Sequence, residues 1–322
     1  MTIPADKTIV ALSGGVGGSK LVAGLNKILA PNQLTTVVNT GDDFEHFGLP
    51  ICPDLDTVLY TLADLNDRER GWGRRDESWA CMETLQALGA EDWFQLGDKD
   101  LALHLTRRQW LQQGESLSQV VERIRGQLGI ASSVVPMSDE PVRTHVQTDQ
   151  GELSFQDYFV RQRCVPKVER FFYRNSENAS PSKGFSHALQ DKNLAGVVIG
   201  PSNPFVSIDP ILSLPGMRET LTGLGVPVVA ISPIVGGKAI KGPAAKMFEE
   251  LGKAASALSV AQHYGNLLSG FVIDDADRET AGLFDEGLKV LVCDTVMVRQ
   301  ADREALARTT LVLVAELGGE GR

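Results

Sequence analysis

The stretch TIVALSGGVGGSKLVAGLNKIL, residues 8–29, is the strongest indication of the fold in the sequence. Its apolar run at 8–12 predicts a buried strand, and a glycine loop follows at 13–18. An apolar pattern with the helical period then runs from about 19 to 30, and a second apolar run, TTVVN, occupies 35–39. Strand, helix and strand in so short a segment imply two parallel strands.

The same alternation returns in the C-terminal third of the chain. Strands are expected at 194–200, 226–232, 271–274 and 289–294, and helices near 216–223, 243–252, 258–269 and 300–315. Residues 54–127 are mostly helical in pattern, with short strands at 132–136 and 144–148. The sequence therefore predicts an α/β fold with a doubly wound, mainly parallel sheet. Its core would be residues 1–60 and 190–322, interrupted by a large, mostly helical insertion at 61–189.

Composition and charge narrow the class of protein. The 322 residues are 43% hydrophobic and carry a formal net charge of −10, which argues against a nucleic-acid or anionic-membrane partner. No apolar stretch is long enough to span a bilayer, and the first residues lack a signal-peptide pattern. The four cysteines form no CxxC pair, so neither a zinc site nor a disulfide framework is expected. A cytoplasmic location is the expectation.

The glycine loop has the composition of an anion-binding turn. Glycines after a buried strand let backbone N–H groups approach an anion, and the following helix N-terminus adds partial positive charge. The loop satisfies neither common phosphate motif. A P-loop needs glycine where Ser19 stands, and a dinucleotide fingerprint needs a third glycine where Lys20 stands. A structural turn without a ligand stays an alternative.

Acidic residues follow the second predicted strand. NTGDDFEHFGL at 39–49 contains Asp42 and Asp43, and CPDLDTVLY at 52–60 places Asp54 and Asp56 at a helix start. Carboxylates at a helix start can be simple caps, which is an equal alternative for Asp54. Two acidic loops beside a phosphate loop also suit Mg²⁺, which prefers a few carboxylates, waters and phosphate oxygens. Asp42 with Asp56 is the expected metal pair.

Three further loops carry groups that could bind a ligand. WFQLGDKDLALH at 93–104 offers Trp93, Phe94 and Gln95 as a flat apolar wall with one amide. GPSNP after the strand at 194–200 offers Ser202 and Asn203 to a phosphate, ribose or base edge. SPIVGGKAIKG at 232–242 sets Lys238 and Lys241 among glycines, either as an anion site or as solvated surface lysines.

Taken together, these motifs resemble the 2-phospho-L-lactate transferase family of coenzyme F-420 biosynthesis, and features of the first two loops resemble its bacterial branch. Archaeal members tend to read GGTGTPK where this chain reads GGVGGSK. The resemblance runs in order over about residues 8–250. It is carried by SGGVGGSKL, VVNTGDDFEHFG, CPDLDTVLYTLA, RGWG, WFQLGDKDLALH, PMSDEPVRTHV, FQDYFV, GPSNPFVSIDPILSLPGMR and SPIVGGKAIKGPAAKM.

The resemblance implies a Rossmann-like fold, usually dimeric, and a Mg²⁺-dependent transfer. The group transferred would be a phospho-three-carbon acid, and it would leave its guanosine diphosphate derivative for the ribityl hydroxyl of the deazaflavin 7,8-didemethyl-8-hydroxy-5-deazariboflavin (Fo). GMP would be released. The acid could be of the 2-phospholactyl, phosphoenolpyruvyl or 3-phosphoglyceryl type, and the sequence leaves the choice open.

The resemblance also implies roles for particular residues. Asp42 and Asp56 would hold the metal and act in catalysis, with Asp56 against the Fo hydroxyl as its general base, so that Asp56→Asn would abolish turnover in a folded protein. Gln95 in the insertion would contribute to the deazaflavin pocket. The nucleotide would be bound by Gly14, Gly15, Gly17, Gly18, Lys20, Gly200, Ser202 and Asn203.

Two other functions stay open at this stage. A Rossmann oxidoreductase could use the glycine loop for NAD, although the missing third glycine and the paired aspartates count against it. A nucleotide-binding regulator without catalysis could share the glycine loop. We would not expect such a regulator to carry both CPDLDTVLY and WFQLGD.

Overall fold

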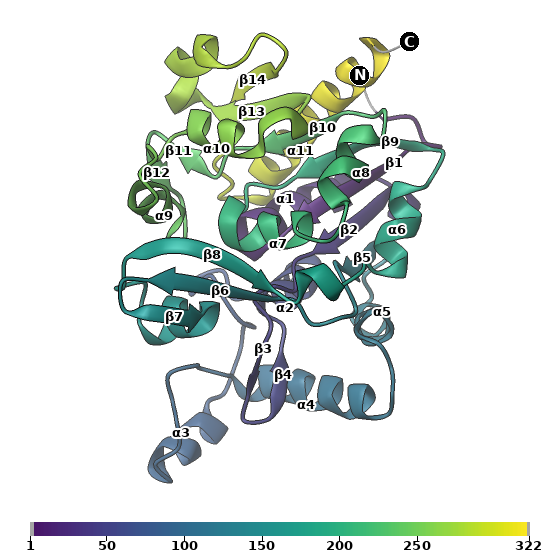
Figure 1. Ribbon diagram of the computed structural model, residues 1–322. Helices are drawn as coiled ribbons and strands as arrows, with labels where there is room; N and C mark the ends of the chain where they lie inside the picture. The colour runs from purple at the N-terminus through teal and green to yellow at the C-terminus, as the bar shows by residue number, and fades with distance from the viewer. Residues whose placement is uncertain (1–2, 321–322) are drawn as a thin grey trace.

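A seven-stranded parallel sheet forms the centre of the protein in the computed structural model, which describes residues 3–320 (Figure 1). Its strands are β1 (Thr8–Ser13), β2 (Leu34–Val38), β5 (Ser133–Pro136), β9 (Leu194–Ile199), β10 (Val228–Ile231), β13 (Gly270–Asp274) and β14 (Lys289–Cys293). They follow the order β14-β13-β10-β9-β1-β2-β5, and each neighbouring pair is parallel. The chain thus winds away from β1 in both directions, which puts a topological switch point between β1 and β9.

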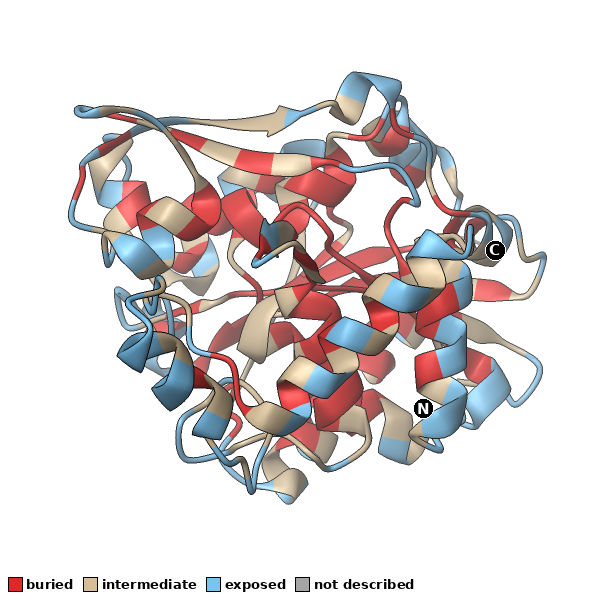
Figure 2. Ribbon diagram, turned by 90° about the horizontal axis from the view of Figure 1, so that it is seen from below, coloured by how far each residue is buried: buried red, intermediate tan, exposed pale blue. Residues whose placement is uncertain are grey.

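Alternate residues of the strands supply two hydrophobic cores, one on each face of the sheet. Ile9 and Ala11 of β1 pack in one core, and Val10 and Leu12 pack in the other. The first core is covered by α1 (Gly15–Ile28), α2 (Pro53–Leu62), α5 (Leu117–Gln127) and α11 (Gln300–Glu320). The second is covered by α6 (Lys183–Leu189), α7 (Asp209–Leu212), α8 (Met217–Gly223), α9 (Ala244–Glu250) and α10 (Ala257–Tyr264). Figure 2 shows the buried ribbon gathered in the sheet and on the inner sides of the helices.

Smaller elements extend the sheet's carboxyl edge. An antiparallel sheet of order β7-β6-β8 is built from β6 (Arg143–Thr148), β7 (Gly151–Ser154) and β8 (Val168–Arg174). The hairpin of β3 (Phe44–His46) and β4 (Leu49–Ile51) lies beside α3 (Ala80–Ala87) and α4 (Asp98–Gln112), at the end of the molecule away from β13 and β14 (Figure 1). A second hairpin joins β11 (Ile234–Val235) to β12 (Lys238–Ala239).

The predicted α/β, doubly wound class is confirmed, but the structure changes two details. Residues 61–189 are not an insertion throughout, because β5 pairs with β2 as an edge strand of the central sheet and α5 packs in the same core. The glycine loop is shorter than expected, since α1 already begins at Gly15. Three of its four glycines therefore lie in the first helical turn, where backbone N–H groups have no partner within the helix.

Gly24 provides a test of the packing of α1 against α11. A Cβ atom at this position would lie 2.2 Å from the backbone oxygen of Arg303, so Gly24→Ala forces two backbones apart. We expect the variant to lose about 1–3 kcal/mol of unfolding free energy in urea titrations. Gly126→Ala in α5 is the matched control, because no atom of residues 3–320 lies within 4 Å of its Cβ position and alanine is the better helix former. Equal stability of the two variants would contradict this account of the contact.

Candidate active site

A cavity of about 730 Å³ opens at the switch point, beyond the carboxyl ends of the parallel strands. Segments distant in the sequence meet around it. They include residues 14–17 after β1, Asp42 after β2, residues 201–203 after β9, and residues 295–297 after β14. Residues 70–72, 93–95 and 240–244 also line it. The volume is within the range of sites that take whole cofactors or substrates.

The N-terminus of α1 forms one wall of this cavity. The N–H of Gly15 donates to Asp54 Oδ1 at 2.7 Å, and the Ser202 hydroxyl donates to the Gly14 carbonyl at 2.8 Å. These bonds join the loops that follow β1 and β9 to the start of α2. Val16 and Gly17 of the first helical turn line the cavity, at the positive end of the α1 helix dipole.

Asp42 and Asp54 form an acid pair on the floor of the cavity. Both side chains are buried and both line the cavity. Burial, and then the charge of Asp54, raises the pKa of Asp42 well above its usual value. Burial also raises the pKa of Asp54 to about 6, although Asn39 and the Gly15 N–H donate to this carboxylate. Among the described residues, Oδ1 of Asp42 has no hydrogen-bond partner, so no donor there offsets its negative charge.

Asp56 does not line the cavity, although it was predicted from the sequence to hold the metal and act in catalysis. Its carboxylate forms a two-pronged ion pair with Arg107 of α4, in which Nη1 donates to Oδ2 at 3.0 Å and Nη2 donates to Oδ1. Arg107 is 0% exposed. Side chains two residues apart on a helix point in different directions, so Asp54 and Asp56 lie on different faces of α2. The structure therefore pairs Asp42 with Asp54 and not with Asp56.

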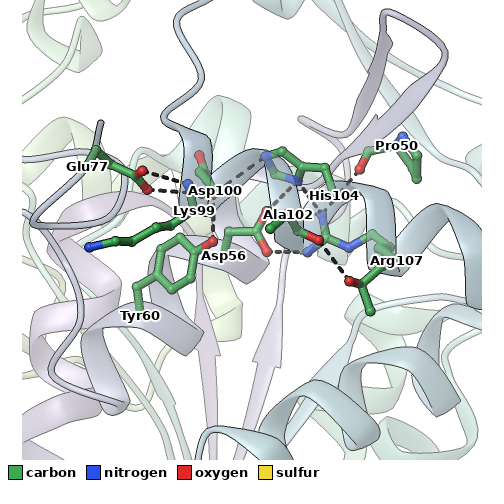
Figure 3. A network of polar contacts seen from close by, with 10 residues as sticks. Pro50, Asp56, Tyr60, Glu77, Lys99, Asp100, Ala102, His104 and Arg107 are labelled. Carbon is green, nitrogen blue, oxygen red and sulfur yellow. Dashed lines mark hydrogen bonds and ion pairs between the residues drawn. The ribbon is translucent and has the colours of Figure 1, made fainter. Parts of the chain in front are cut away.

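A buried polar network continues from Asp56 along α4. His104 Nδ1 lies 3.1 Å from Arg107 Nη1, and the Tyr60 hydroxyl donates to Asp100 at 2.6 Å (Figure 3). Asp56, Asp100 and His104 are close enough to surround a metal ion. The Arg107 guanidinium already occupies both oxygens of Asp56, however, and its positive charge would repel a cation there. This cluster is better explained as the packing of α2 against α4.

Aromatic side chains form another part of the cavity wall. Trp93, Phe94 and Gln95 line the cavity as predicted, and the Gln95 amide donates to the Asp92 carbonyl at 2.6 Å. Phe155 and Phe159 were not predicted as site residues, yet both line the cavity. Their rings stack with centroids 5.3 Å apart. Their signal was the FQDYFV stretch, which carries two aromatic rings four residues apart on one helical turn.

Most predicted site residues meet at this cavity. The eight that line it are Gly14, Gly15, Gly17, Lys20, Asp42, Gln95, Ser202 and Asn203. Gly18 and Gly200 do not, and their role is close packing. A Cβ at Gly18 would lie 2.5 Å from the Ser202 hydroxyl oxygen, and a Cβ at Gly200 would lie 2.9 Å from the Gly18 Cα. Of the two lysines in the loop at 232–242, Lys241 lines the cavity and Lys238 does not.

The fold and the cavity define a Rossmann-like α/β protein with its site at the switch point of the sheet. Comparison with known proteins gives the family. Residues 9–311 match the family described as 2-phospho-L-lactate transferase CofD, and the chain belongs to this family.

Two curated relatives cover nearly the whole chain. A phosphoenolpyruvate transferase from Kitasatospora aureofaciens is 39% identical over 312 residues, which are 93% of this chain and 97% of that protein. A 2-phospho-L-lactate transferase from Methanosarcina acetivorans is 39% identical over 300 residues, 93% of this chain and 96% of that one. The chain is thus a transferase of phospho-acid groups in coenzyme F-420 biosynthesis, and neither the oxidoreductase nor the regulator is favoured.

A solved structure supports the fold. The UPF0052 family protein from Bacillus halodurans superposes with a TM-score of 0.61 at 17% identity, covering 95% of this chain and 98% of that one. Within residues 3–320, the structure contains no helix with the length and apolar character needed to cross a membrane.

Proposed function

We propose that this protein transfers a phospho-three-carbon-acid group from its guanosine diphosphate derivative to the terminal ribityl hydroxyl of Fo and releases GMP. The acid is of the 2-phospholactyl, phosphoenolpyruvyl or 3-phosphoglyceryl type. In this reaction the hydroxyl oxygen bonds to the phosphorus that carries the acid, the bond from that phosphorus to the oxygen of GMP breaks, and one proton is released. We further propose that the enzyme is a cytoplasmic homodimer.

A single observation carries this proposal: one cavity joins a helix N-terminus, an acid pair and an aromatic wall. The helix N-terminus and the Ser202 loop suit the diphosphate of the donor. The aromatic wall of Trp93, Phe94 and Phe159 suits the flat deazaflavin ring. The acid pair lines the same cavity, in which the hydroxyl and the phosphorus have to meet.

The acid pair also fits a magnesium ion. Two desolvated carboxylates that repel one another, with Oδ1 of Asp42 unpartnered, form an oxygen-rich site that a divalent cation would stabilise. When bound there, Mg²⁺ would neutralise charge on the transferred phosphoryl group. We therefore assign the metal site to Asp42 and Asp54 in place of Asp42 and Asp56.

The same geometry changes the assignment of the general base. Both oxygens of Asp56 accept from Arg107, so this carboxylate is poorly suited to take a proton from substrate. The acid pair lines the cavity, so its carboxylates can reach a substrate hydroxyl bound there. Asp42 and Asp54 are our candidates for accepting the hydroxyl proton.

A product assay tests the proposed function. The purified enzyme is given Fo, Mg²⁺ and each of the three guanylated acids in turn, and the products are identified by mass spectrometry. We expect GMP and one phosphodiester of Fo, and the donor that gives product identifies the acid. Formation of no phosphodiester from any of the three donors would refute the proposal.

A further inference from the structure

The charged residues in the cavity wall differ sharply in their surroundings. Among the described residues that line the cavity, the acidic ones are Asp42 and Asp54 and the basic ones are Lys20, Arg70 and Lys241. Arg70 lies 3.9 Å from Asp67 and 4.4 Å from the centre of the Trp79 ring, so it is partly neutralised within the protein. Among residues 3–320, Lys20 and Lys241 have no such partner. The family resemblance implies only that Lys20 contributes to nucleotide binding, and Lys241 has been given no role so far.

Lys20 lies in a region of excess positive charge. Its ammonium donates to the Met297 carbonyl at 2.8 Å, and no carboxylate among residues 3–320 lies within 4.0 Å of it. Burial lowers the pKa of Lys20, and the positive charges of Arg303 and Lys241 lower it further. The Arg303 side chain is itself buried, and its Nε has no hydrogen-bond partner within the part of the chain that the structure describes. Cations held together in this way repel one another unless an anion lies between them.

The loop after β11 brings Lys241 to this region. Gly236, Gly237 and Gly242 have φ values of 55°, 76° and 74°, a left-handed conformation that other residues adopt only with strain. The resulting tight hairpin brings Lys241 against the segment 70–72, which also lines the cavity. Its Nζ lies so close to Gly71 that a Cβ there would be 2.0 Å away. Lys238, in the same hairpin, is exposed like Lys241 but lies outside the cavity lining.

We propose that Lys241 and Lys20 together form a subsite for an oxyanion of the donor substrate. The identity of that substrate rests on the function proposed above, whereas the two uncompensated cations are a property of this chain. Two oxyanions of the donor have suitable chemistry, namely the second phosphate of guanosine diphosphate and the carboxylate of the three-carbon acid. The hairpin at 236–242 thus contributes to specificity for an acidic donor.

Binding measurements without Fo test the subsite and distinguish its two possible anions. Dissociation constants for GMP, GDP and guanylated 2-phospholactate are measured by calorimetry for the wild type, Lys241→Met and Lys238→Met. If Lys241 holds the second phosphate, Lys241→Met weakens GDP and the guanylated acid about tenfold and leaves GMP unchanged. If it holds the carboxylate, only the guanylated acid is weakened. In both cases Lys241→Arg retains most of the affinity.

Lys238→Met is the matched control, since it removes the same charge from the same hairpin outside the cavity. We expect it to bind all three ligands like the wild type. The proposal is overturned if Lys241→Met binds them all unchanged, or if both variants lose affinity equally. Because the binding measurement needs no turnover, it still tests the subsite if the product assay fails. Conversely, unchanged dissociation constants for Lys241→Met would leave the proposed function intact.

Discussion

An Asp56→Asn variant is expected to lose about 3–5 kcal/mol of its free energy of unfolding, because it leaves a buried guanidinium without its counter-charge. Arg107 is fully buried, and Asp56 is the carboxylate that its two Nη atoms contact. Nη1 also contacts the Pro50 carbonyl oxygen at 3.2 Å and His104 Nδ1, and neither of these groups carries a negative charge that could replace the Asp56 carboxylate. Urea titration followed by circular dichroism measures the loss.

A double variant separates the charge effect from simple loss of contacts. Asp56→Asn/Arg107→Met removes both charges, and we expect it to recover part of the lost stability because no unpaired charge stays buried. If Asp56→Asn instead keeps wild-type stability and loses turnover, the role of general base that the family resemblance implies for Asp56 would be supported over the structural role.

The sequence predicted the fold more completely than the details of the site. Apolar strands alternating with helices were enough to predict the parallel sheet and to place the glycine loop, Asp42 and Ser202 at its carboxyl edge. The edge strand β5 was found as a strand but assigned to the insertion. Four residues give too little pattern to show that β5 pairs with β2 across almost a hundred residues of chain.

The choice between Asp54 and Asp56 could not be made from the sequence. Both lie in the first turn of α2, and a carboxylate there can cap the helix, bind a ligand or pair with another helix. Asp54 accepts a hydrogen bond from the Gly15 N–H at the N-terminus of α1, the helix that directly follows β1. Asp56 is bonded by Arg107, which comes from a helix 51 positions later. Such distant contacts decide the roles, and helical spacing alone does not reveal them.

Asp54→Asn is expected to lower turnover by at least about a hundredfold while the protein stays folded. Its carboxylate fastens Gly15 at the helix N-terminus, accepts from Asn39 at 2.9 Å and faces Asp42, so it joins the anion-binding wall to the acid pair. Asparagine keeps one acceptor oxygen but removes the charge that a cation needs. Turnover of Fo is measured beside the melting temperature with and without Mg²⁺.

The thermal measurement makes this prediction independent of turnover. Mg²⁺ that binds the native acid pair stabilises the folded state by mass action, so it should raise the melting temperature of the wild type. The rise should disappear in Asp54→Asn and in Asp42→Asn, and it should persist in Asp285→Asn, which removes an exposed carboxylate that does not line the cavity. A full Mg²⁺ response in Asp54→Asn would remove Asp54 from the metal site. A normal turnover rate in that variant would remove it from the reaction as well, leaving it as the cap of α1.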